Sequence, residues 1–231
     1  MVNQEFSHVS SWFNANKLAV HPDKSKFIIF HPRRKQINPL ELNILINNTP
    51  IVRVQEHKFL GIIIHENLSW KPHITSIRDK VAKVIGILSK SRRYLPSVNL
   101  KTLYNSLFLP YINYCNLIWA TTYASYLEPL YVLQKKAIRI ITFSHQRNRS
   151  KLLFSAKLNT LSLHSLYKIH VSCFVFSHFN RVLPASLSSL LHFNRDFHDY
   201  LTRSCFNLHK MTLRYQFAIC SQALTIWNDN P

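Results

Sequence analysis

The sequence predicts an α+β fold, in which a small antiparallel β-sheet with one helix is followed by a mostly α-helical bundle. Two observations support this prediction. Before residue 66, short runs of β-branched and aromatic residues alternate with turn residues, a pattern typical of strands. After it, apolar residues recur at helical spacing over long segments. The change falls next to residues 56–64, a β-rich run that holds one of only two glycines in the 231-residue chain.

The composition indicates a packed and strongly basic protein. Hydrophobic residues make up 47% of the chain and aromatic residues 13%, which is enough for a core. The 29 Lys and Arg residues exceed the 10 Asp and Glu residues, so the formal net charge is +19. Such an excess favours a polyanionic partner, and charge alone leaves nucleic acid and an acidic membrane surface as alternatives.

The sequence contains no segment typical of a membrane span or an export signal. No window of 18 apolar residues exists, and the first 13 residues lack the basic and then apolar pattern of a signal peptide. The four cysteines are scattered without the spacing of a zinc site, which predicts reduced and mostly buried thiols. We therefore expect an intracellular protein, cytoplasmic or nuclear and not secreted, with no membrane partner.

Residues 4–16 are predicted to form the first helix, because Phe6, Val9, Trp12 and Phe13 recur at helical spacing. The apolar stripe of this helix requires a sheet to pack on. Because one helical pattern starts almost at the first residue and another ends almost at the last, we expect the chain to be an incomplete structural unit.

A sheet is predicted to follow this helix. Its strands are expected at residues 26–30, 42–46, 51–54 and 58–64. The second and third runs flank Asn47 and Asn48, a turn-prone pair typical of a β-hairpin. Residues 32–36 form a basic loop, for which a solvated loop tip is the favoured interpretation.

Gly61 lies inside the last predicted strand. Glycine is unfavourable in a strand, where it usually marks a β-bulge or a place where a ligand or another backbone comes close. From spacing alone, a bulge in a buried strand is the favoured interpretation.

Residues 72–93 form the clearest predicted helix. One stripe of this helix is apolar and consists of Ile74, Ile77, Val81, Val84, Ile85 and Leu88. At about 100° per residue, Lys80, Lys83 and Lys90 centre roughly 140° from that stripe. A solvated face and a phosphate-facing lysine ridge are the two interpretations, and only Asp79 supplies a balancing acid.

Five further helices are predicted. They are residues 98–109 with Ser97 as N-cap, residues 110–119, residues 126–143 with Ser125 as N-cap, residues 161–180 and residues 215–227. In the third of them, Leu127, Leu130, Gln134, Ala137, Ile138 and Ile141 are predicted to face inward. Lys135, Lys136 and Arg139 are predicted to face outward, and residues 144–151 form a second basic loop.

Eight basic residues of these helices and their ends are candidates for nucleic-acid binding. They are Lys80, Lys83, Lys90, Arg92, Arg93, Lys135, Lys136 and Arg139.

We expect no metal site. The dense polar cluster near the C-terminus consists of Asp196, His198 and Asp199. Carboxylates and imidazoles are metal ligands, but nothing else converges on this cluster, and Arg195 and Arg203 would pair with its acids. His164 and His178 interrupt an apolar helix, a pattern more typical of half-buried structural histidines than of ligands.

Several short sequence segments occur in a fixed order, and this order is more informative than any one segment alone. They are Trp12-Phe13-Asn14-Ala15-Asn16-Lys17-Leu18; Asp23-Lys24-Ser25-Lys26 before Phe27-Ile28-Ile29-Phe30; Lys58-Phe59-Leu60-Gly61-Ile62; Leu68-Ser69-Trp70-Lys71-Pro72-His73-Ile74; Leu103-Tyr104; Pro110-Tyr111-Ile112-Asn113-Tyr114-Cys115 with Trp119; Leu133-Gln134-Lys135-Lys136-Ala137-Ile138-Arg139; Thr202-Arg203; and Trp227-Asn228. Their order across nearly the whole chain resembles the C-terminal part of reverse transcriptases from LINE-type (non-LTR) retrotransposons, closest to the jockey-like group.

This resemblance implies a right-hand polymerase of which the chain holds one portion. Residues 1–66 would finish the palm, residues 67–160 would form a thumb-like bundle, and residues 161–231 would form a helical C-terminal extension. Lys58, Phe59, Leu60, Gly61 and Ile62 match the family's primer-grip hairpin region, where the backbone approaches the primer closely. The lysine ridge would then lie along a template–primer duplex and hold its phosphates.

The resemblance also implies a role for a lysine before the grip. Lys24 falls on a motif whose lysine is proposed to protonate the pyrophosphate leaving group, with Lys26 as the competing assignment. For either lysine, an ordinary surface position is the alternative interpretation.

The family's polymerases resemble the two-metal scheme, in which paired aspartates hold Mg²⁺. No two acidic residues are adjacent anywhere in this sequence. We therefore predict that the chain holds no cofactor and cannot polymerise by itself, because the upstream palm and fingers portion would have to supply the aspartates.

Two other functions remain as alternatives. One is a non-enzymatic basic nucleic-acid-binding protein derived from such an element, which would lose affinity steeply with salt. The other is an inert product whose exposed apolar surface causes aggregation.

Overall fold

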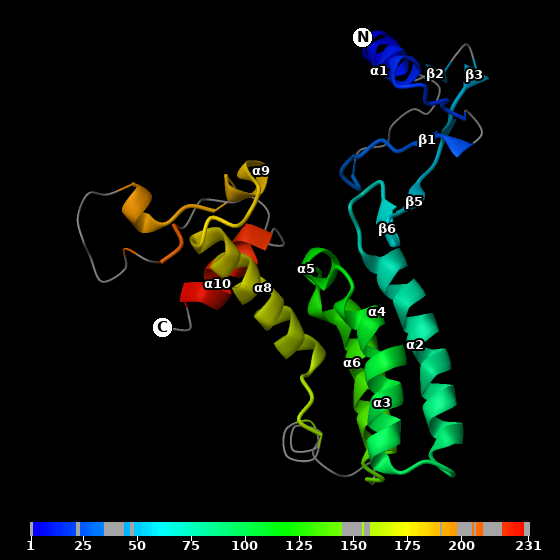
Figure 1. Cartoon of the computed structure of the whole chain (residues 1–231), viewed down its shortest axis with the longest axis vertical. Coiled ribbons are helices and arrows are strands. Elements are labelled where there is room, and N and C mark those ends of the chain that lie inside the picture. The colour runs from blue at the N-terminus through cyan, green and yellow to red at the C-terminus, as the bar shows by residue number, and fades with distance from the viewer. Residues whose placement is uncertain are drawn as a thin grey trace. The chain divides into compact units, whose positions relative to one another are not determined.

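The computed structural model describes residues 2–21, 24–34, 44–46, 49–144, 154, 158–189, 191–197, 205, 207–209 and 219–228. The chain divides into two units, Met1–His73 and Ile74–Pro231 (Figure 1). Strands occur only in the first unit and most of the helical residues lie in the second, as far as the described residues go. The three-part division at residues 66 and 160 remains a prediction.

The first unit opens with helix α1, Val2–Ala15, as the sequence predicted. The helix lies against strand β2, where the Leu45 backbone N–H donates to Asn3 Oδ1 at 3.3 Å. Its apolar stripe is only partly covered, because Trp12 is 59% exposed and Val9 44% exposed. The expected packing of this stripe on a sheet is therefore incomplete within the described residues.

Six short strands form three separate pairs. They are β1 (Lys26–Phe27), β2 (Leu45–Ile46), β3 (Thr49–Pro50), β4 (Val52–Arg53), β5 (Glu56–Phe59) and β6 (Ile62–His65). Strands β2 with β3 and β5 with β6 are antiparallel, whereas β1 with β4 is parallel. The prediction of one antiparallel sheet is thus wrong in its arrangement, although two of the three pairs are antiparallel.

The parallel pair explains why the predicted strands were misassigned. Residues 51–54 were expected to complete the hairpin, but Val52 and Arg53 pair with β1 instead. A parallel pair requires a long connection, and the 24 residues between Phe27 and Val52 provide it. The hairpin itself closes on Thr49–Pro50, and its Asn47–Asn48 turn lies outside the described residues, as do residues 35 and 36 of the basic loop.

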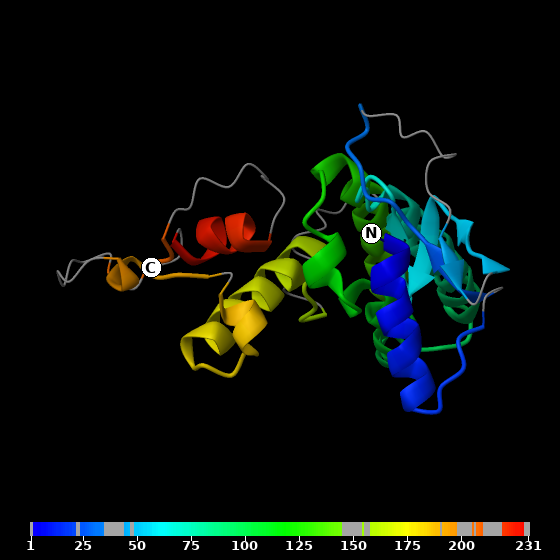
Figure 2. The same ribbon diagram turned by 90° about the horizontal axis from the view of Figure 1, so that it is seen from above.

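The second unit is helical. Its elements are α2 (Lys71–Ser91), α3 (Ser97–Leu107), α4 (Leu109–Asn113), α5 (Asn116–Trp119), α6 (Ala124–Ile141), α8 (Leu163–Phe179), α9 (Ala185–Ser188), a 3₁₀ turn (Asn194–Asp196) and α10 (Ile219–Asn228). Helix α2 begins with the last three residues of the first unit. Helices α2, α3, α4 and α6 gather in one bundle, and α8 packs against α5 and α10 (Figures 1 and 2).

Two predicted N-caps and one predicted helix differ from the structure. Ser97 and Ser125 lie inside their helices, and the N-caps are Pro96 and Tyr123, which make no side-chain capping bond. The helix predicted at residues 110–119 is broken, because Cys115 takes a left-handed conformation with φ 49°. The indole N–H of Trp119 donates to the Tyr114 carbonyl across this break at 2.9 Å, and this hydrogen bond stabilises the broken conformation.

The predicted helix cores are confirmed. All six apolar residues of the α2 stripe are buried, as are the six residues of α6 that were predicted to face inward. Helix α8 agrees with the prediction for residues 161–180 and is capped by Ser162, whose hydroxyl accepts from the Ser165 backbone N–H at 3.2 Å. The last predicted helix is described from Ile219 onward.

The cysteines were predicted to be mostly buried. Cys205 is buried, Cys115 is half-buried and Cys173 is exposed on α8, so this prediction is wrong for Cys173. The part of the chain that the structure describes contains no helix long and apolar enough to cross a membrane.

Candidate nucleic-acid interface

Residues 56–65 form a two-stranded hairpin with a tight turn. Strands β5 and β6 pair from Glu56 opposite His65 to Phe59 opposite Ile62. Leu60 and Gly61 between them have φ values of 45° and 85°. Positive φ at both central residues is the geometry of a type I′ turn, whose twist matches that of the flanking strands.

The predicted single strand with a bulge at Gly61 is therefore wrong. Gly61 occupies the turn because the second central position needs a positive φ, which glycine takes without a steric penalty. Leu60 adopts the same region despite its side chain, at an energetic cost.

The tip of the hairpin is exposed and apolar. Phe59 is 59% exposed and Leu60 is 74% exposed, and every residue of β5, including His57 and Lys58, is exposed. Ile62 on the opposite strand is buried at 7%. Strand β5 thus exposes its side chains to solvent, and those of Lys58 and Phe59 lie close to the turn.

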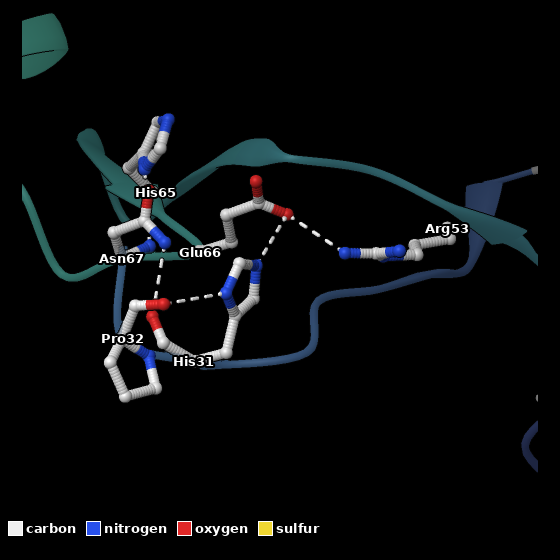
Figure 3. A network of polar contacts seen from close by, with 6 residues as sticks. All are labelled: His31, Pro32, Arg53, His65, Glu66 and Asn67. Atoms are coloured by element: carbon white, nitrogen blue, oxygen red, sulfur yellow. Dashed lines mark hydrogen bonds and ion pairs between the residues drawn. The ribbon is translucent and has the colours of Figure 1, made fainter. Parts of the chain in front are cut away.

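The base of the hairpin is held by Glu66, which is 9% exposed. Figure 3 shows its carboxylate between an arginine and a histidine: Arg53 Nη2 lies 3.0 Å from Glu66 Oε2, and His31 Nε2 lies 3.5 Å from the same oxygen. The Asn67 side-chain amide donates to the His31 carbonyl at 3.0 Å. The loop after β6 is therefore fixed to β4 and to the loop after β1.

Backbone contacts strengthen the same base. The Glu66 N–H donates to the Gln55 carbonyl at 2.8 Å, and the His31 N–H donates to the Glu66 carbonyl at 3.1 Å. The Ile63 N–H donates to Nδ1 of His73, a buried residue in the first turn of α2, at 3.3 Å. The base of the hairpin is thus fixed and its tip is exposed, an arrangement suited to binding a partner at the tip.

Lys24 and Lys26, the candidate leaving-group acids, are both exposed. Lys26 lies in β1 opposite Val52, and Lys24 precedes it in a short turn. No hydrogen bond or ion pair between described side chains joins either lysine to the hairpin. The structure does not separate the two assignments.

The lysine ridge of α2 lies on the exposed side of the helix. Lys80, Lys83 and Lys90 are exposed, while the stripe on the other side is buried. The Lys80 ammonium lies 5.7 Å from the centre of the Tyr111 ring. Asp79, the one acid of this helix, is 2.9 Å from Arg78 and is thereby neutralised locally.

The ends of α2 and α6 meet in a second basic region. The Arg92 guanidinium lies 4.8 Å from the centre of the Phe143 ring, which is 50% exposed, and Arg93 is exposed beside it. Cations at helix C-termini also complement the helix dipoles, so part of this arrangement has a structural explanation.

The prediction that three basic residues of α6 face outward holds fully only for Lys136, which is exposed. Lys135 is half-buried, 3.3 Å from Glu128 and 3.9 Å from the centre of the Tyr131 ring. Arg139 is also half-buried, and its buried Nε makes no hydrogen bond within the described residues. These two positions flank the apolar stripe too closely to be fully exposed.

No group of three or more His, Cys, Asp and Glu side chains that could hold a metal ion occurs in the described ranges. Of the predicted C-terminal polar cluster, His198, Asp199 and Arg203 lie outside those ranges. Asp196 is placed, and its carboxylate accepts from the Phe193 N–H at 2.8 Å and lies 3.8 Å from Arg195 Nε. This supports pairing with arginine for that acid.

The Glu66 site was not predicted from the sequence. Its partners His31 and Arg53 lie 35 and 13 positions earlier in the chain, and no local pattern joins them. A lone acid directly after a strand of isoleucines is the one signal that could have drawn attention to it.

Two known proteins are similar in sequence to this chain. One is described as a probable RNA-directed DNA polymerase from transposon X-element of Drosophila melanogaster, and it is 28% identical over 144 residues. The other is described as an RNA-directed DNA polymerase from mobile element jockey of Drosophila funebris, and it is 27% identical over 103 residues. No protein-family model matches the chain, and no solved structure matches it.

The matched regions cover 60% and 43% of this chain. They cover only 15% and 11% of the two relatives, so the chain corresponds to a small part of each polymerase. The resemblance to jockey-like, LINE-type reverse transcriptases is confirmed by these similarities.

Proposed function

We propose that this chain is the portion of a non-LTR reverse transcriptase that holds the template–primer duplex, and that it does not polymerise by itself. In this proposal residues 58–62 act as a primer grip and the helical bundle acts as a thumb. Its partner is nucleic acid, bound through the phosphates rather than through base edges.

The basic face of α2 carries this proposal. Helix α2 buries its apolar stripe and carries lysines on the other side, so packing of the stripe sets the direction in which the lysines face. Apart from Asp79, which Arg78 neutralises, the helix has no acid to compensate those lysines. Such a surface lowers the free energy of a phosphate backbone laid along it, by releasing condensed counterions.

The hairpin supports the proposal in a different way. Phe59 and Leu60 expose apolar surface at a turn whose base is fixed by Glu66, Arg53 and His31. An exposed aromatic ring with a lysine beside it can stack on a sugar or base at a primer end while the lysine meets a phosphate.

We assign no magnesium site to this chain in the proposal. The paired aspartates of the two-metal scheme are absent from the sequence, and the described residues offer no other cluster of ligands. No catalytic step is assigned to Lys24 or Lys26, and the polymerase activity of the relatives would require residues that this chain does not contain.

Binding is tested with purified full-length chain and a 20-base-pair RNA–DNA hybrid. We expect the logarithm of the binding constant to fall linearly with the logarithm of salt concentration, and the double variant Lys83→Gln/Lys90→Gln to reduce that slope by about 2. Lys168→Gln on α8 is the matched control, since it removes an exposed lysine far along the chain, and it should leave the slope unchanged. Association that does not depend on salt would contradict the proposal.

The absence of polymerase activity is tested by primer extension with Mg²⁺ and deoxynucleotides. We expect no extension by the chain alone. Extension would contradict that part of the proposal. A chain that binds duplex but never supports extension when a palm and fingers polypeptide is added would favour the alternative, a non-enzymatic nucleic-acid-binding protein.

A further inference from the structure

Gly86 is placed where neither packing nor backbone conformation accounts for a glycine. It lies in the interior of α2, where glycine is less favourable than any residue except proline. A Cβ atom added at this position would meet nothing within 4 Å. The only glycine with a positive φ among the described residues is Gly61, so Gly86 is not required by its dihedral angles either.

The position of Gly86 on the helix is distinctive. At about 100° per residue it points almost directly away from the buried stripe, on the outermost line of the helix. Lys83 and Lys90 lie about one turn to either side of it on the exposed side of the helix, and Arg93 follows two residues after the helix ends at Ser91. All four residues are exposed, and no ion pair between described residues involves the three cations.

These residues form a basic strip, defined here as Lys83, Gly86, Lys90 and Arg93. Lys83 and Lys90 are roughly 10 Å apart along the axis at the 1.5 Å rise of a helix. Between them the helix surface is bare backbone, because the glycine contributes no side chain. The strip therefore places one lysine on each side of the gap that the missing side chain leaves, and a polyanion can approach the backbone there.

We propose that Gly86 is a positioning residue at which one sugar–phosphate strand of a bound duplex contacts the backbone of α2. This inference rests on the proposed function. Lys83 and Lys90 would neutralise phosphates on either side of the contact, and the missing Cβ would let the strand come within van der Waals distance of the helix. A helix of a partner protein would need apolar residues on either side of Gly86 to pack against. The residues there are Lys83 and Lys90, which favour a polyanion instead.

The test separates stability from binding. Gly86→Ala and Gly86→Leu should each raise the melting temperature, because both residues favour the helix and an added Cβ atom meets nothing within 4 Å. Both should weaken binding of the 20-base-pair RNA–DNA hybrid, with Leu weakening it about tenfold or more, since added bulk forces a close contact apart. If Gly86 had only a structural role, a substitution that raises the melting temperature would not at the same time weaken binding of the hybrid.

Thr102→Ala is the matched control. Thr102 is exposed on α3, and its hydroxyl bonds back to the Val98 carbonyl at 3.3 Å, so alanine should also favour the helix. This variant should leave hybrid binding unchanged. If it weakens binding as much as Gly86→Ala does, stiffening of the bundle explains both and the inference is overturned.

Two further outcomes are decisive. If the wild-type chain binds the hybrid and Gly86→Leu binds it equally well, the inference is wrong while the proposed function stands. If the wild-type chain shows no salt-dependent binding at all, the proposed function and this inference both fall.

Discussion

Gln134 connects α3, α6 and the start of α8 through one fully buried side chain. Its amide nitrogen donates to Tyr104 Oη at 2.9 Å and to the Leu161 carbonyl at 3.0 Å, and its oxygen accepts from the Leu163 N–H at 2.8 Å. Burial raises the pKa of Tyr104 to about 12, an effect that the Gln134 bond partly opposes, so the phenol stays protonated at neutral pH.

Replacing Gln134 by Leu should lower the free energy of unfolding by about 3 kcal/mol or more, because buried polar groups lose their partner. Tyr104→Phe should cost only about 1 kcal/mol, since Gln134 keeps its other bonds. Urea denaturation of the two variants measures both values. Equal costs would show that the three bonds do not act together.

The His178 imidazole is the side chain whose titration should be visible in the stability of the C-terminal part. Burial lowers its pKa below the usual value, an effect that the Asp196 charge opposes and that His192 and Arg195 reinforce. Its ring stacks on Phe193 with centroids 5.4 Å apart.

A histidine whose pKa is lower in the folded state is protonated more readily in the unfolded state. Its contribution to stability is therefore complete above the unfolded pKa of about 6.5 and is lost as pH falls below that value. The difference in melting temperature between wild type and His178→Gln should shrink as pH falls from 7 toward 5. A difference that stays constant over this range would contradict the prediction.

At the scale of single residues, helical periodicity predicted which side chains point inward. It identified Gln134 as inward-facing, but its partners lie 27 to 30 positions away and could not be predicted. The same limit applies to Glu66. A periodic pattern defines a face, whereas a hydrogen bond depends on which other element meets that face.

At the scale of elements, the hairpin at residues 56–65 shows what turn chemistry adds. Its Leu60–Gly61 turn was not recognised, because leucine rarely takes a positive φ and an Asn-Gly or Asp-Gly pair is the usual signal. The presence of the helices was predicted well from their periodicity, but the N-caps predicted at Ser97 and Ser125 were wrong. Pro96 and Tyr123 occupy the N-cap positions and make no side-chain capping bond.

Leu60→Asn should stabilise the hairpin, since asparagine tolerates the left-handed region and completes the preferred type I′ pair with Gly61. Gly61→Val should destabilise it by about 1 kcal/mol or more, because a β-branched residue is strained at φ 85°. Hydrogen exchange of the paired β5 and β6 amides measures both effects. Faster exchange in Leu60→Asn would contradict the turn assignment.

At the scale of the whole molecule, the net charge of +19 acts on stability and on binding in opposite directions. Lysines and arginines repel one another in the folded chain, and salt screens this repulsion. We expect the urea midpoint to rise between 20 and 200 mM KCl while affinity for the hybrid falls. Choline chloride should reproduce the rise, and a constant or falling midpoint would contradict the electrostatic explanation.

The family resemblance could be drawn from the sequence because it depends on patterns along the chain. The α+β fold class is compatible with the observed helices and strands and stays a prediction. The pairing of β1 with β4 depends on contacts across 24 intervening residues, and periodicity carries no information about it. The exposure of basic side chains was predicted correctly on α2, where a single helix supplies the lysines. It was overestimated on α6, where Lys135 and Arg139 are half-buried by neighbouring side chains.

The burial of Trp119 has a practical consequence for following the second unit. Its indole is fully buried and bonded to the Tyr114 carbonyl, whereas Trp12 in the first unit is already 59% exposed. Because indole fluorescence shifts to the red when water reaches the ring, loss of the bundle moves the emission of Trp119 and leaves that of Trp12 nearly where it was. Trp70 and Trp227 are half-buried and would also respond, so Trp119 becomes a built-in fluorescent reporter of the unit that carries the basic helix face in a variant with phenylalanine at those two positions.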